Sequence, residues 1–344
     1  MSPAASDRQG TEPARPDRVP GSLGIVVIGR NEGDRLRRCL DSLSGLMSRT
    51  VYVDSGSVDD SLSMSMARGA SVVELDTNVP FTAARARNEG FRKLLELHAS
   101  LEYVFFVDGD CEVVSGWSSA AVQFMEQHPQ AAAVWGRVRE RYPERSIYNL
   151  LCDMEWNAFP VGETTACGGN VVMRVCAFRQ VNGFHPRLIC GEEPELCVRL
   201  RKAGWQIWHV DTEMTLHDAA LLRFSQWWKR AVRSGYAYAQ GARLHGRPPE
   251  RHWVAESRRI WLWGLWLPLI ALAGAALISL WALLILLVYP LQVVRIAAKD
   301  GRPTAQSWLR AGALILGKFP EMLGQMKFTL DLLRKVESPI IEYK

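Results

Sequence analysis

Two carboxylates separated by a single glycine follow an apolar run in the first third of the chain. Residues 104–107 are Val-Phe-Phe-Val, and Asp108, Gly109 and Asp110 come directly after them. A continuous apolar run is typical of a strand buried in a parallel sheet. Two carboxylates on the turn after such a strand could bind Mg²⁺ or Mn²⁺ together with the oxygens of a bound phosphate. For this triplet alone, an Asp-Gly turn exposed to water is the alternative interpretation.

Polar residues also follow two other predicted strands. They are Arg30, Asn31 and Glu32 after the strand at residues 24–29, and Asp54 after the strand at residues 50–53. Ligands of parallel α/β sheets bind beyond the carboxyl ends of the strands. We therefore expect these side chains to line one crevice together with the acidic turn. Helix capping or turn formation is the alternative for Asp54.

Strands and helices alternate along the first part of the chain, which predicts βαβ units and a parallel sheet. Helices are predicted at residues 34–46, from the capping residues 59–61 onward, and from the cap at Thr82 to about residue 97, with a strand at residues 71–75. No Gly-x-Gly-x-x-Gly motif follows a strand, which argues against a dinucleotide site. Later segments predict a mixed sheet: strands at 131–138, 170–175 and 204–210, and helices at 146–159 and 191–203.

The composition allows a sizeable core, since 48% of the 344 residues are hydrophobic, and a net charge of +5 is weak evidence for a nucleic-acid partner. The seven cysteines form no CxxC pair, so we expect neither a zinc site nor a disulfide framework, and we expect a reducing compartment. Residues 1–22 are rich in Pro, Arg, Asp and Ser and lack the apolar core of a signal peptide. They are predicted to be a disordered tail that starts in the cytoplasm.

The carboxyl-terminal third is predicted to attach to a membrane. Residues 221–259 form a basic, aromatic-rich amphipathic linker with nine Arg and Lys residues. Residues 260–294 are almost unbroken apolar sequence, longer than the about 20 residues that one membrane span needs. Basic residues flank this segment, taken as 260–298, on both sides, which predicts that both ends are cytoplasmic. Two short helices hinged near Gly274 and one long tilted span are the alternatives.

The last segment, residues 304–344, has apolar residues at helical spacing and a break at Pro320. It is predicted to be amphipathic and to lie on the bilayer surface.

Seven short motifs occur along the chain in the order VVIGRNEGDRLRRCLDSL, VYVDSGSVDDS, AARARNEGF, VFFVDGD, ACGGNVVMR, NGF and GEEPELCVRLRKAGW. In this order and spacing they resemble glycosyltransferase family 2, the inverting GT-A transferases, over roughly residues 23–218. The resemblance implies an α/β fold of the GT-A type, with a Rossmann-like mixed sheet, for a catalytic domain at residues 23–220. Membrane-associated helices would follow at the carboxyl end.

The resemblance also implies roles for individual residues. The nucleotide-sugar donor would contact Arg30, Asn31, Glu32, Asp54, Arg85, Arg87, Asn88 and Asp108. A carboxylate such as Asp54 can accept an N–H group of uracil or guanine. For the residues from 85 to 88, a solvated helix face is the alternative. The donor sugar or the acceptor would contact Gly168, Gly169 and Asn170, for which a plain turn is the alternative.

The same resemblance implies a metal site and a base. Asp110 would bind the Mg²⁺ or Mn²⁺ ion, Asp108 would touch the ion or the ribose, and His217 would be a further ligand through its neutral imidazole, unless it is a structural hydrogen-bonding residue. The ion would make the diphosphate a better leaving group. Glu193, where the family usually has an aspartate, would deprotonate the acceptor hydroxyl, and Glu192 is the second candidate. Acidic residues that favour a helix N-terminus are the alternative.

The expected function is metal-dependent transfer of a sugar, with inversion, from a donor of the UDP, GDP or dTDP type to a hydroxyl group. The membrane segment suggests a lipid-linked acceptor in surface polysaccharide or glycolipid assembly, at the cytoplasmic face of the inner membrane. Residues 226–230, QWWKR, only loosely resemble the QxxRW motif of processive members, so a polymer synthase is not expected.

Two other functions are alternatives. A sugar nucleotidyltransferase needs a glycine-rich loop with Arg or Lys after the first strand, and residues 29–33 do not provide one. A non-catalytic basic protein of the membrane surface, or a nucleic-acid-binding protein, would account for the basic linker. Tryptophans beside the apolar segment favour lipid over nucleic acid, so we expect no nucleic-acid partner.

Overall fold

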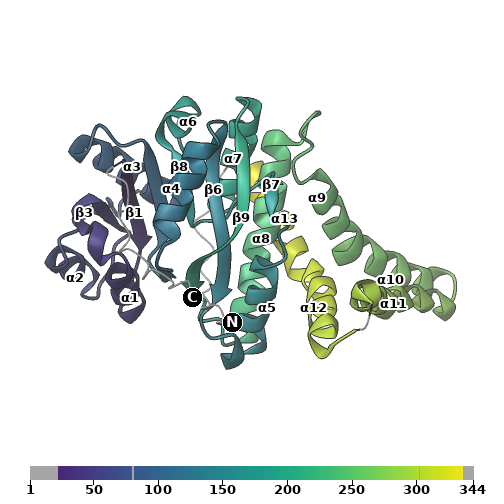
Figure 1. Ribbon diagram of the computed structural model, residues 1–344. Coiled ribbons are helices and arrows are strands. Elements are labelled where there is room, and N and C mark those ends of the chain that lie inside the picture. Colours follow the sequence, from purple (N-terminus) through teal and green to yellow (C-terminus); the bar gives the residue numbers. More distant parts are fainter. Residues whose placement is uncertain (1–21, 80, 302, 336–344) are drawn as a thin grey trace, which may run out of the picture.

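The computed structural model of the chain describes residues 22–79, 81–301 and 303–335 (Figure 1). Within them, nine strands form one sheet in the order β3-β2-β1-β4-β8-β6-β9-β5, with β7 beside β9. The strands are β1 (Leu23–Gly29), β2 (Thr50–Asp54), β3 (Ser71–Glu74), β4 (Tyr103–Asp108), β5 (Cys111–Val113), β6 (Ala131–Glu140), β7 (Gly162–Thr164), β8 (Val171–Arg174) and β9 (Gln206–His217). Residues 1–21 of the predicted tail lie outside the described residues.

One half of the sheet is parallel and the other half is mixed, as the order of elements predicts. β1 pairs in parallel with β2 and β4, and β2 pairs in parallel with β3. β8 runs antiparallel to β4 and β6, whereas β6 and β9 run parallel. β9 is longer than the strand predicted at residues 204–210, because its second half pairs with both β6 and β5 and so continues to His217.

Helices pack on the sheet and complete the α/β domain. They are α1 (Asp34–Ser42), α2 (Ser61–Ala67), α3 (Ala83–Leu97), α4 (Trp117–Gln127), α5 (Ile147–Trp156), α6 (Val175–Gln180) and α7 (Glu192–Lys202), with the 3₁₀ turns η1 (Ser44–Arg49) and η2 (Pro143–Arg145). The predicted cap at Thr82 is confirmed, since its side chain accepts from Arg85 N–H at 3.0 Å. α3 can lie close to β1 because Gly90 has no side chain. A Cβ at this position would come within 2.4 Å of Val26 Cγ1.

Buried aromatic side chains pack around β4, the strand that carries the acidic turn. Phe105 and Phe106 are fully buried. The ring of Phe106 lies 5.2 Å from the rings of both Phe178 and Phe184, which come from the later, mixed half of the domain. Each buried aromatic side chain contributes about 1.5–3 kcal/mol through the apolar area it removes from water. This packing holds β4, and with it Asp108, against both halves of the sheet.

The chain after the sheet is helical. The elements are α8 (Phe224–His245), α9 (Val254–Trp261), the π-helical turn η3 (Leu262–Trp266), α10 (Leu267–Leu277), η4 (Leu280–Leu287), α11 (Val288–Ala297), η5 (Ala298–Asp300), α12 (Ala305–Leu316) and α13 (Lys318–Arg334). From α9 to α11 the chain forms a helical hairpin, residues 254–297, which we call the apolar hairpin. It extends away from the sheet (Figure 1).

The apolar hairpin corresponds to the two-helix alternative and not to one long span. Its legs, Val254–Leu277 and Leu280–Ala297, are each long and apolar enough to cross a membrane. The turn lies at Ile278 and Ser279, a few residues beyond the hinge expected near Gly274. Both turn residues donate their backbone N–H to Gly274 O, so this glycine ends the first leg.

The predicted break at Pro320 is wrong. The chain separates α12 from α13 at Gly317, and Pro320 lies in the first turn of α13, where its missing N–H removes no helical hydrogen bond. α13 also packs on α8, since a Cβ at Gly324 would come within 2.0 Å of Val232 O. One face of this predicted amphipathic segment is therefore covered by protein and is not free to lie on a bilayer.

Candidate active site

The carboxyl ends of β1, β2 and β4 lie side by side. Gly29 is paired with Asp54, and Ile28 is paired with Asp108, so the loops that follow are neighbours. Asn31 joins two of these loops through hydrogen bonds of 2.9 and 2.8 Å to the loop after β2. The predicted residues of these three strand ends therefore meet at one edge of the sheet.

Asp54 is buried and holds its own loop. Its carboxylate accepts hydrogen bonds from Tyr52 O–H at 3.0 Å, from Gly56 N–H at 2.9 Å and from Ser57 N–H at 2.7 Å. This is the arrangement of the turn-forming alternative. A contact between Asp54 and a nucleobase stays a prediction, and it would require the carboxylate to share or release these bonds.

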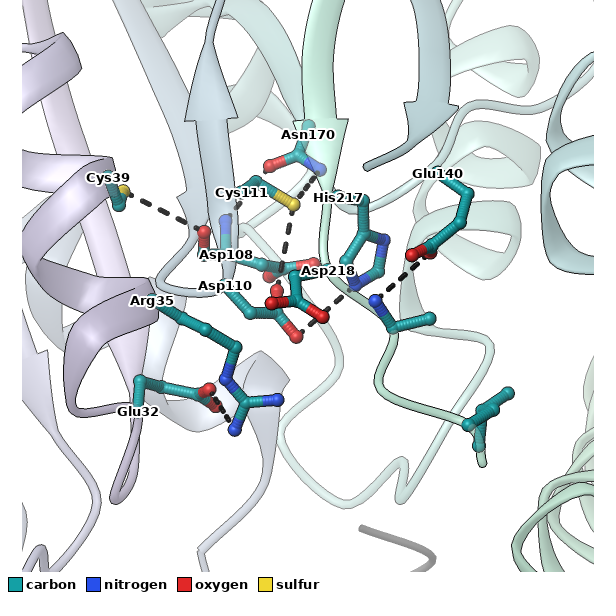
Figure 2. Close-up of polar contacts among 12 residues, drawn as sticks. Glu32, Arg35, Cys39, Asp108, Asp110, Cys111, Glu140, Asn170, His217 and Asp218 are labelled. Atoms are coloured by element: carbon teal, nitrogen blue, oxygen red, sulfur yellow. Dashed lines mark hydrogen bonds and ion pairs between the residues drawn. The ribbon is translucent and has the colours of Figure 1, made fainter. Parts of the chain in front are cut away.

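Asp110 and His217 meet because β5 pairs with the end of β9. Cys111 lies opposite His217 in this pair, and Asp110 Oδ2 is 3.2 Å from His217 Nε2 (Figure 2). The His217 ring also stacks on Trp156, with 4.5 Å between centroids and 9° between planes. Strand pairing and ring stacking thus direct one imidazole nitrogen and one carboxylate toward the same place.

This pair fits a divalent cation. Apart from its 3.2 Å contact with Asp110 Oδ2, the buried His217 Nε2 has no hydrogen-bond partner among the described residues. Asp110, Cys111 and His217 present ligand atoms within 4.8 Å of one another. Burial, and then the charge of Asp110, raise the pKa of Cys111 well above its ordinary value, so the thiol stays protonated and is a weak ligand. Asp110 and His217 are therefore the candidate ligands.

One buried arginine connects the acidic turn to the candidate base. Arg87 Nη2 donates to Asp108 Oδ1 at 2.8 Å, and its Nη1 lies 2.9 Å from Glu192 Oε1 and 2.8 Å from Glu193 Oε1. Burial alone would lower the pKa of Arg87, but the three carboxylates, Glu193 first, outweigh it and raise that pKa. A Cβ at Gly169 would lie 2.6 Å from Arg87 Nη2 and 2.7 Å from Asp108 Oδ2, so only glycine fits beside this cluster.

Glu193 has the properties of a general base. Burial, followed by the charge of Glu192, raises its pKa from 4.5 to about 7, against the lowering effect of Arg87. A carboxyl group with a pKa near neutrality is well matched to accept a proton from a hydroxyl group. Its side chain is 13% exposed and that of Glu192 is 5% exposed, which makes Glu193 the more accessible of the two.

Two predicted donor residues on α3 have structural partners. The Asn88 side-chain amide donates to Phe184 O and accepts from Phe184 N–H, at 2.8 and 2.9 Å. Arg85 Nη1 donates to the carbonyls of Asp76 and Val79 at 3.1 and 2.9 Å. Neither side chain lies on a solvated helix face, and both tie α3 to neighbouring loops. Of the three predicted residues on this helix, Arg87 is the one that contacts Asp108.

The loop after β1 is also held in place. The Arg30 guanidinium lies 4.6 Å above the centroid of the Phe81 ring, and Glu32 pairs with Arg35 at 2.7 Å (Figure 2). Both interactions orient the loop at the edge where the donor is expected.

Asn170 supports the acidic turn directly. Its side-chain oxygen accepts from Asp108 N–H at 2.9 Å, and its Nδ2 donates to Cys111 Sγ at 3.1 Å (Figure 2). Gly168 faces open space. Asn170 is thus turned toward the protein, whereas contacts of Gly168 with a sugar stay a prediction.

Three side chains near the site were not identified from the sequence. Trp156 stacks on His217. Arg38 Nη2 lies 3.1 Å from Asp218 Oδ2, and Glu140 accepts a hydrogen bond from Ala219 N–H at 3.1 Å. Burial raises the pKa of Glu140. These side chains come from α5, α1 and β6, elements distant in the sequence, and no local pattern marks them.

The fold is of the GT-A type, a mixed α/β sheet followed by helices. A sequence model of the family described as Glycosyl transferase family 2 matches residues 24–181. Residues 24–181 thus form a domain of the type that this family model describes, and the resemblance of the motifs within that range is confirmed. The pre-mycofactocin glycosyltransferase of Mycobacterium tuberculosis (strains CDC 1551 / Oshkosh and ATCC 25618 / H37Rv) is 27% identical over 222 residues. That match covers 59% of this chain and 44% of the relative, so it spans less than half of the relative's length.

A solved structure shows the same fold. The mannosyltransferase PcManGT from Pyrobaculum calidifontis, in complex with GDP-Man and Mn²⁺, has a TM-score of 0.56 and 20% identity, with 89% of this chain and 90% of that chain covered. The glucosyl-3-phosphoglycerate synthase of M. tuberculosis has a TM-score of 0.47 and 19% identity, with 66% and 81% covered. The first likeness confirms the predicted α/β fold with a mixed sheet followed by helices.

Proposed function

We propose that the chain transfers a sugar from a nucleotide-sugar donor to a hydroxyl group of an acceptor, with inversion. The observation that carries this proposal is the convergence at one edge of the sheet of a candidate cation site, Asp110 and His217, with a candidate base, Glu193. The match of residues 24–181 to the model of glycosyltransferase family 2 supports sugar transfer. The GDP-Man and Mn²⁺ bound by PcManGT support a nucleotide-sugar donor, of the UDP, GDP or dTDP type, and a divalent cation, Mg²⁺ or Mn²⁺.

The donor would bind beyond the ends of β1, β2 and β4. A cation held by Asp110 and His217 would offset the negative charge that develops on the leaving diphosphate. Asp108 is fixed by Arg87 at 2.8 Å, yet its side chain remains 30% exposed, so a carboxylate oxygen can still contact the ribose or the cation. Arg87 is too buried to reach a donor and acts by orienting the carboxylates around it.

Glu193 would accept the proton of the acceptor hydroxyl. The hydroxyl oxygen then attacks the anomeric carbon from the face opposite the diphosphate, the new carbon–oxygen bond forms as the bond to the diphosphate breaks, and the configuration inverts. Arg87 on α3 holds the Glu193 carboxylate at 2.8 Å, so the base at the start of α7 is oriented by a side chain of a second helix.

We propose further that the acceptor is lipid-linked, as in surface polysaccharide or glycolipid assembly, and that the protein works at the cytoplasmic face of the inner membrane. The apolar hairpin supports this placement, because a membrane-attached enzyme meets an acceptor that is carried by the same membrane.

A thermal-shift panel of the full chain in detergent tests the donor proposal. We expect one class among UDP-, GDP- and dTDP-sugars to raise the melting temperature only when Mn²⁺ is present, and turnover to release the nucleoside diphosphate. Stabilisation by none of these donors, with or without Mn²⁺, would contradict the proposal. Release of pyrophosphate from a nucleoside triphosphate and a sugar phosphate would indicate a nucleotidyltransferase instead.

A further inference from the structure

The apolar hairpin carries its most exposed side chains at its turn. Leu277, Ile278, Leu280 and Trp281 are 84%, 86%, 75% and 77% exposed. Contiguous apolar surface of this kind marks an interaction site, because a soluble surface rarely gathers so many large apolar side chains in one place. The turn points away from the sheet, and no described part of the chain covers it (Figure 1).

The turn satisfies its own backbone. The N–H groups of Ile278 and Ser279 donate to Gly274 O at 2.9 and 3.0 Å, and Ala282 N–H donates to Ser279 O at 2.9 Å. From residue 260 to residue 288, Ser279 is the only residue with a hydroxyl, amide or charged side chain. Backbone polar groups must find partners inside the chain when the surroundings are hydrocarbon. The turn meets that requirement, and it has almost no polar side chains that could bind water.

Charged residues gather at the opposite end of the apolar hairpin. Arg258 and Arg259 lie near the start of the first leg, and Arg295 and Lys299 lie at and just beyond the end of the second. Because the two legs run in opposite directions, these four cations share one end. Cations at that position can meet the anionic headgroups of a membrane surface.

The two legs contact each other as membrane helices do. A Cβ at Gly274 would lie 2.8 Å from Ala282 Cβ, so small residues let the legs approach near the turn. Farther from the turn, Tyr289 O–H donates to Trp263 O, and the two rings lie 5.6 Å apart in an edge-to-face arrangement. Aromatic residues with a polar group are typical of the headgroup level. The hairpin thus has an interfacial end and a hydrocarbon end.

The length of the apolar hairpin bears on how deep its turn can reach into a bilayer. From Ile260 to the turn, about 18 helical residues span roughly 27 Å at 1.5 Å per residue. The hydrocarbon core of a bilayer is about 30 Å thick. The leg is thus about as long as the hydrocarbon core is thick, and its length is compatible with either a crossing or a re-entrant path. The turn favours the re-entrant path, because it has no polar loop to place among the headgroups on the far side.

We propose that the apolar hairpin is a re-entrant membrane anchor. It enters the bilayer from the side that holds the catalytic domain, turns within the hydrocarbon core at residues 277–281 and returns to the same side. Its partner is a lipid bilayer with anionic headgroups. This topology goes beyond the proposed sugar transfer, and its tests use no sugar donor, so either proposal can fail without the other.

Probes at two positions test the depth of the turn. The background is Cys176→Ser in the full chain, because Cys176 is exposed and the other six cysteines are buried. Ser279→Cys and Lys299→Cys each carry an NBD fluorophore, and the proteins are reconstituted into vesicles of phosphatidylcholine and phosphatidylglycerol. We expect the probe at 279 to be quenched mainly by lipids with a nitroxide on the acyl chain, and the matched probe at 299 by lipids with a nitroxide on the headgroup.

Dithionite, which bleaches NBD in water and does not cross bilayers, separates the other topologies. Added outside or trapped inside, it should bleach the probe at 279 from neither side. Bleaching from the side opposite the probe at 299 would show a hairpin that crosses the membrane and would overturn the proposal. Bleaching from the same side would show a turn in water. A probe at 279 that is protected from dithionite but not quenched by lipid nitroxides would show a second copy of the chain over the turn. A turn in water and a turn covered by a second copy would each also overturn the proposal.

A charge at the turn gives an independent test. Leu280→Asp should release most of the protein from membranes on washing with alkaline carbonate, because the carboxylate opposes entry into hydrocarbon. Met66→Asp is the matched control, since Met66 is 58% exposed on α2 of the catalytic domain, and it should leave membrane retention unchanged. The melting temperature of each variant in detergent reports folding. A folded Leu280→Asp protein that stays with the membrane as the parent does would contradict the anchor.

Discussion

The catalytic edge of the sheet and the apolar hairpin treat polar groups in opposite ways. At the edge, Arg87 gathers three carboxylates within 2.9 Å, and Asp110 meets His217 at 3.2 Å. In the hairpin, Ser279 is the single hydroxyl in a long apolar stretch, and large apolar side chains face outward. A buried charge needs a partner, and an exposed apolar surface needs a non-aqueous neighbour. The contrast is what the two proposals require: paired charges where sugar transfer is proposed and an outward apolar surface where membrane attachment is proposed.

The two regions are nevertheless joined. A second, smaller core lies behind the loop that leads to Glu193, formed by Ile189, Cys190, Tyr236 and Ala237 with Trp253 and Phe328 packed against it. Trp253 immediately precedes α9, the first helix of the hairpin, and a Cβ at Gly191 would lie 2.8 Å from its ring. The apolar hairpin therefore begins directly beside the start of α7, the helix that carries the candidate base.

The largest effect is expected at the candidate base. Glu193→Gln should lower kcat by about a thousandfold, within the range of general-base catalysis, because the amide cannot accept the hydroxyl proton. Donor affinity and membrane retention should not change, and this result would separate catalysis from membrane attachment. Steady-state transfer, donor titration and carbonate extraction measure the three quantities. A nearly normal kcat would move the base elsewhere, with Glu192→Gln as the next variant.

Removal of a candidate ligand should follow in size. Asp110→Asn should weaken Mn²⁺ binding by at least about a hundredfold, since even indirect contacts to a metal are worth 10–100-fold. Titration of the donor-free protein with Mn²⁺, followed by electron paramagnetic resonance, measures it. Asp211→Asn is the matched control, because Asp211 lies on β9, the strand that ends at His217, and pairs with Arg137 on the surface. Equal Mn²⁺ affinity in the two variants would exclude Asp110 as a ligand.

The packing of α13 on α8, outside both regions, should respond to a single methyl group. Gly324→Ala should lower the free energy of unfolding by about 1–3 kcal/mol, because the new Cβ would come within 2.0 Å of Val232 O on α8. Gly312→Ala is the control, since a Cβ at Gly312 in α12 meets open space and should stabilise the helix by up to about 1 kcal/mol. Thermal unfolding in detergent compares them. Equal melting temperatures would mean that α13 does not pack on α8 in this way.

The smallest predicted effect is on pH dependence. Since the pKa of Glu193 is raised to about 7, the log of kcat should fall by about one per pH unit below pH 7 and level off above it. The sign for stability is opposite. A folded pKa above the ordinary 4.5 gives a stabilising contribution that is complete below pH 4.5 and is lost as pH rises through 7. A flat rate profile between pH 5 and 8, together with an active Glu193→Gln variant, would exclude this group.

Much of the parallel half could be predicted from short patterns. The apolar run at residues 104–107 lies in β4, Thr82 caps α3, and the polar loops after β1, β2 and β4 meet at one edge. Each of these features depends on a few neighbouring residues, or on the rule that carboxyl ends of parallel strands face the same way.

Other features could not be predicted because they depend on contacts across the fold. Asn88, expected beside the donor, clamps the backbone of Phe184. The Asp54 carboxylate accepts hydrogen bonds from its own strand and loop. The break placed at Pro320 occurs at Gly317, because a proline is tolerated in the first turn of a helix and the course of the chain is decided by packing on α8.

The amino-acid sequence by itself determined the alternation of strands and helices, the acidic turn and the apolar segment, because periodicity, capping and hydropathy act over a few residues. Only the tertiary structure decided that Arg87 would hold Glu192, 105 positions away, and that His217 would reach Asp110 through the pairing of β5 with β9. It likewise decided that the apolar segment folds back on itself at Ser279. Such contacts form when distant segments are brought together by sheet pairing and core burial, and no local pattern of residues contains that information.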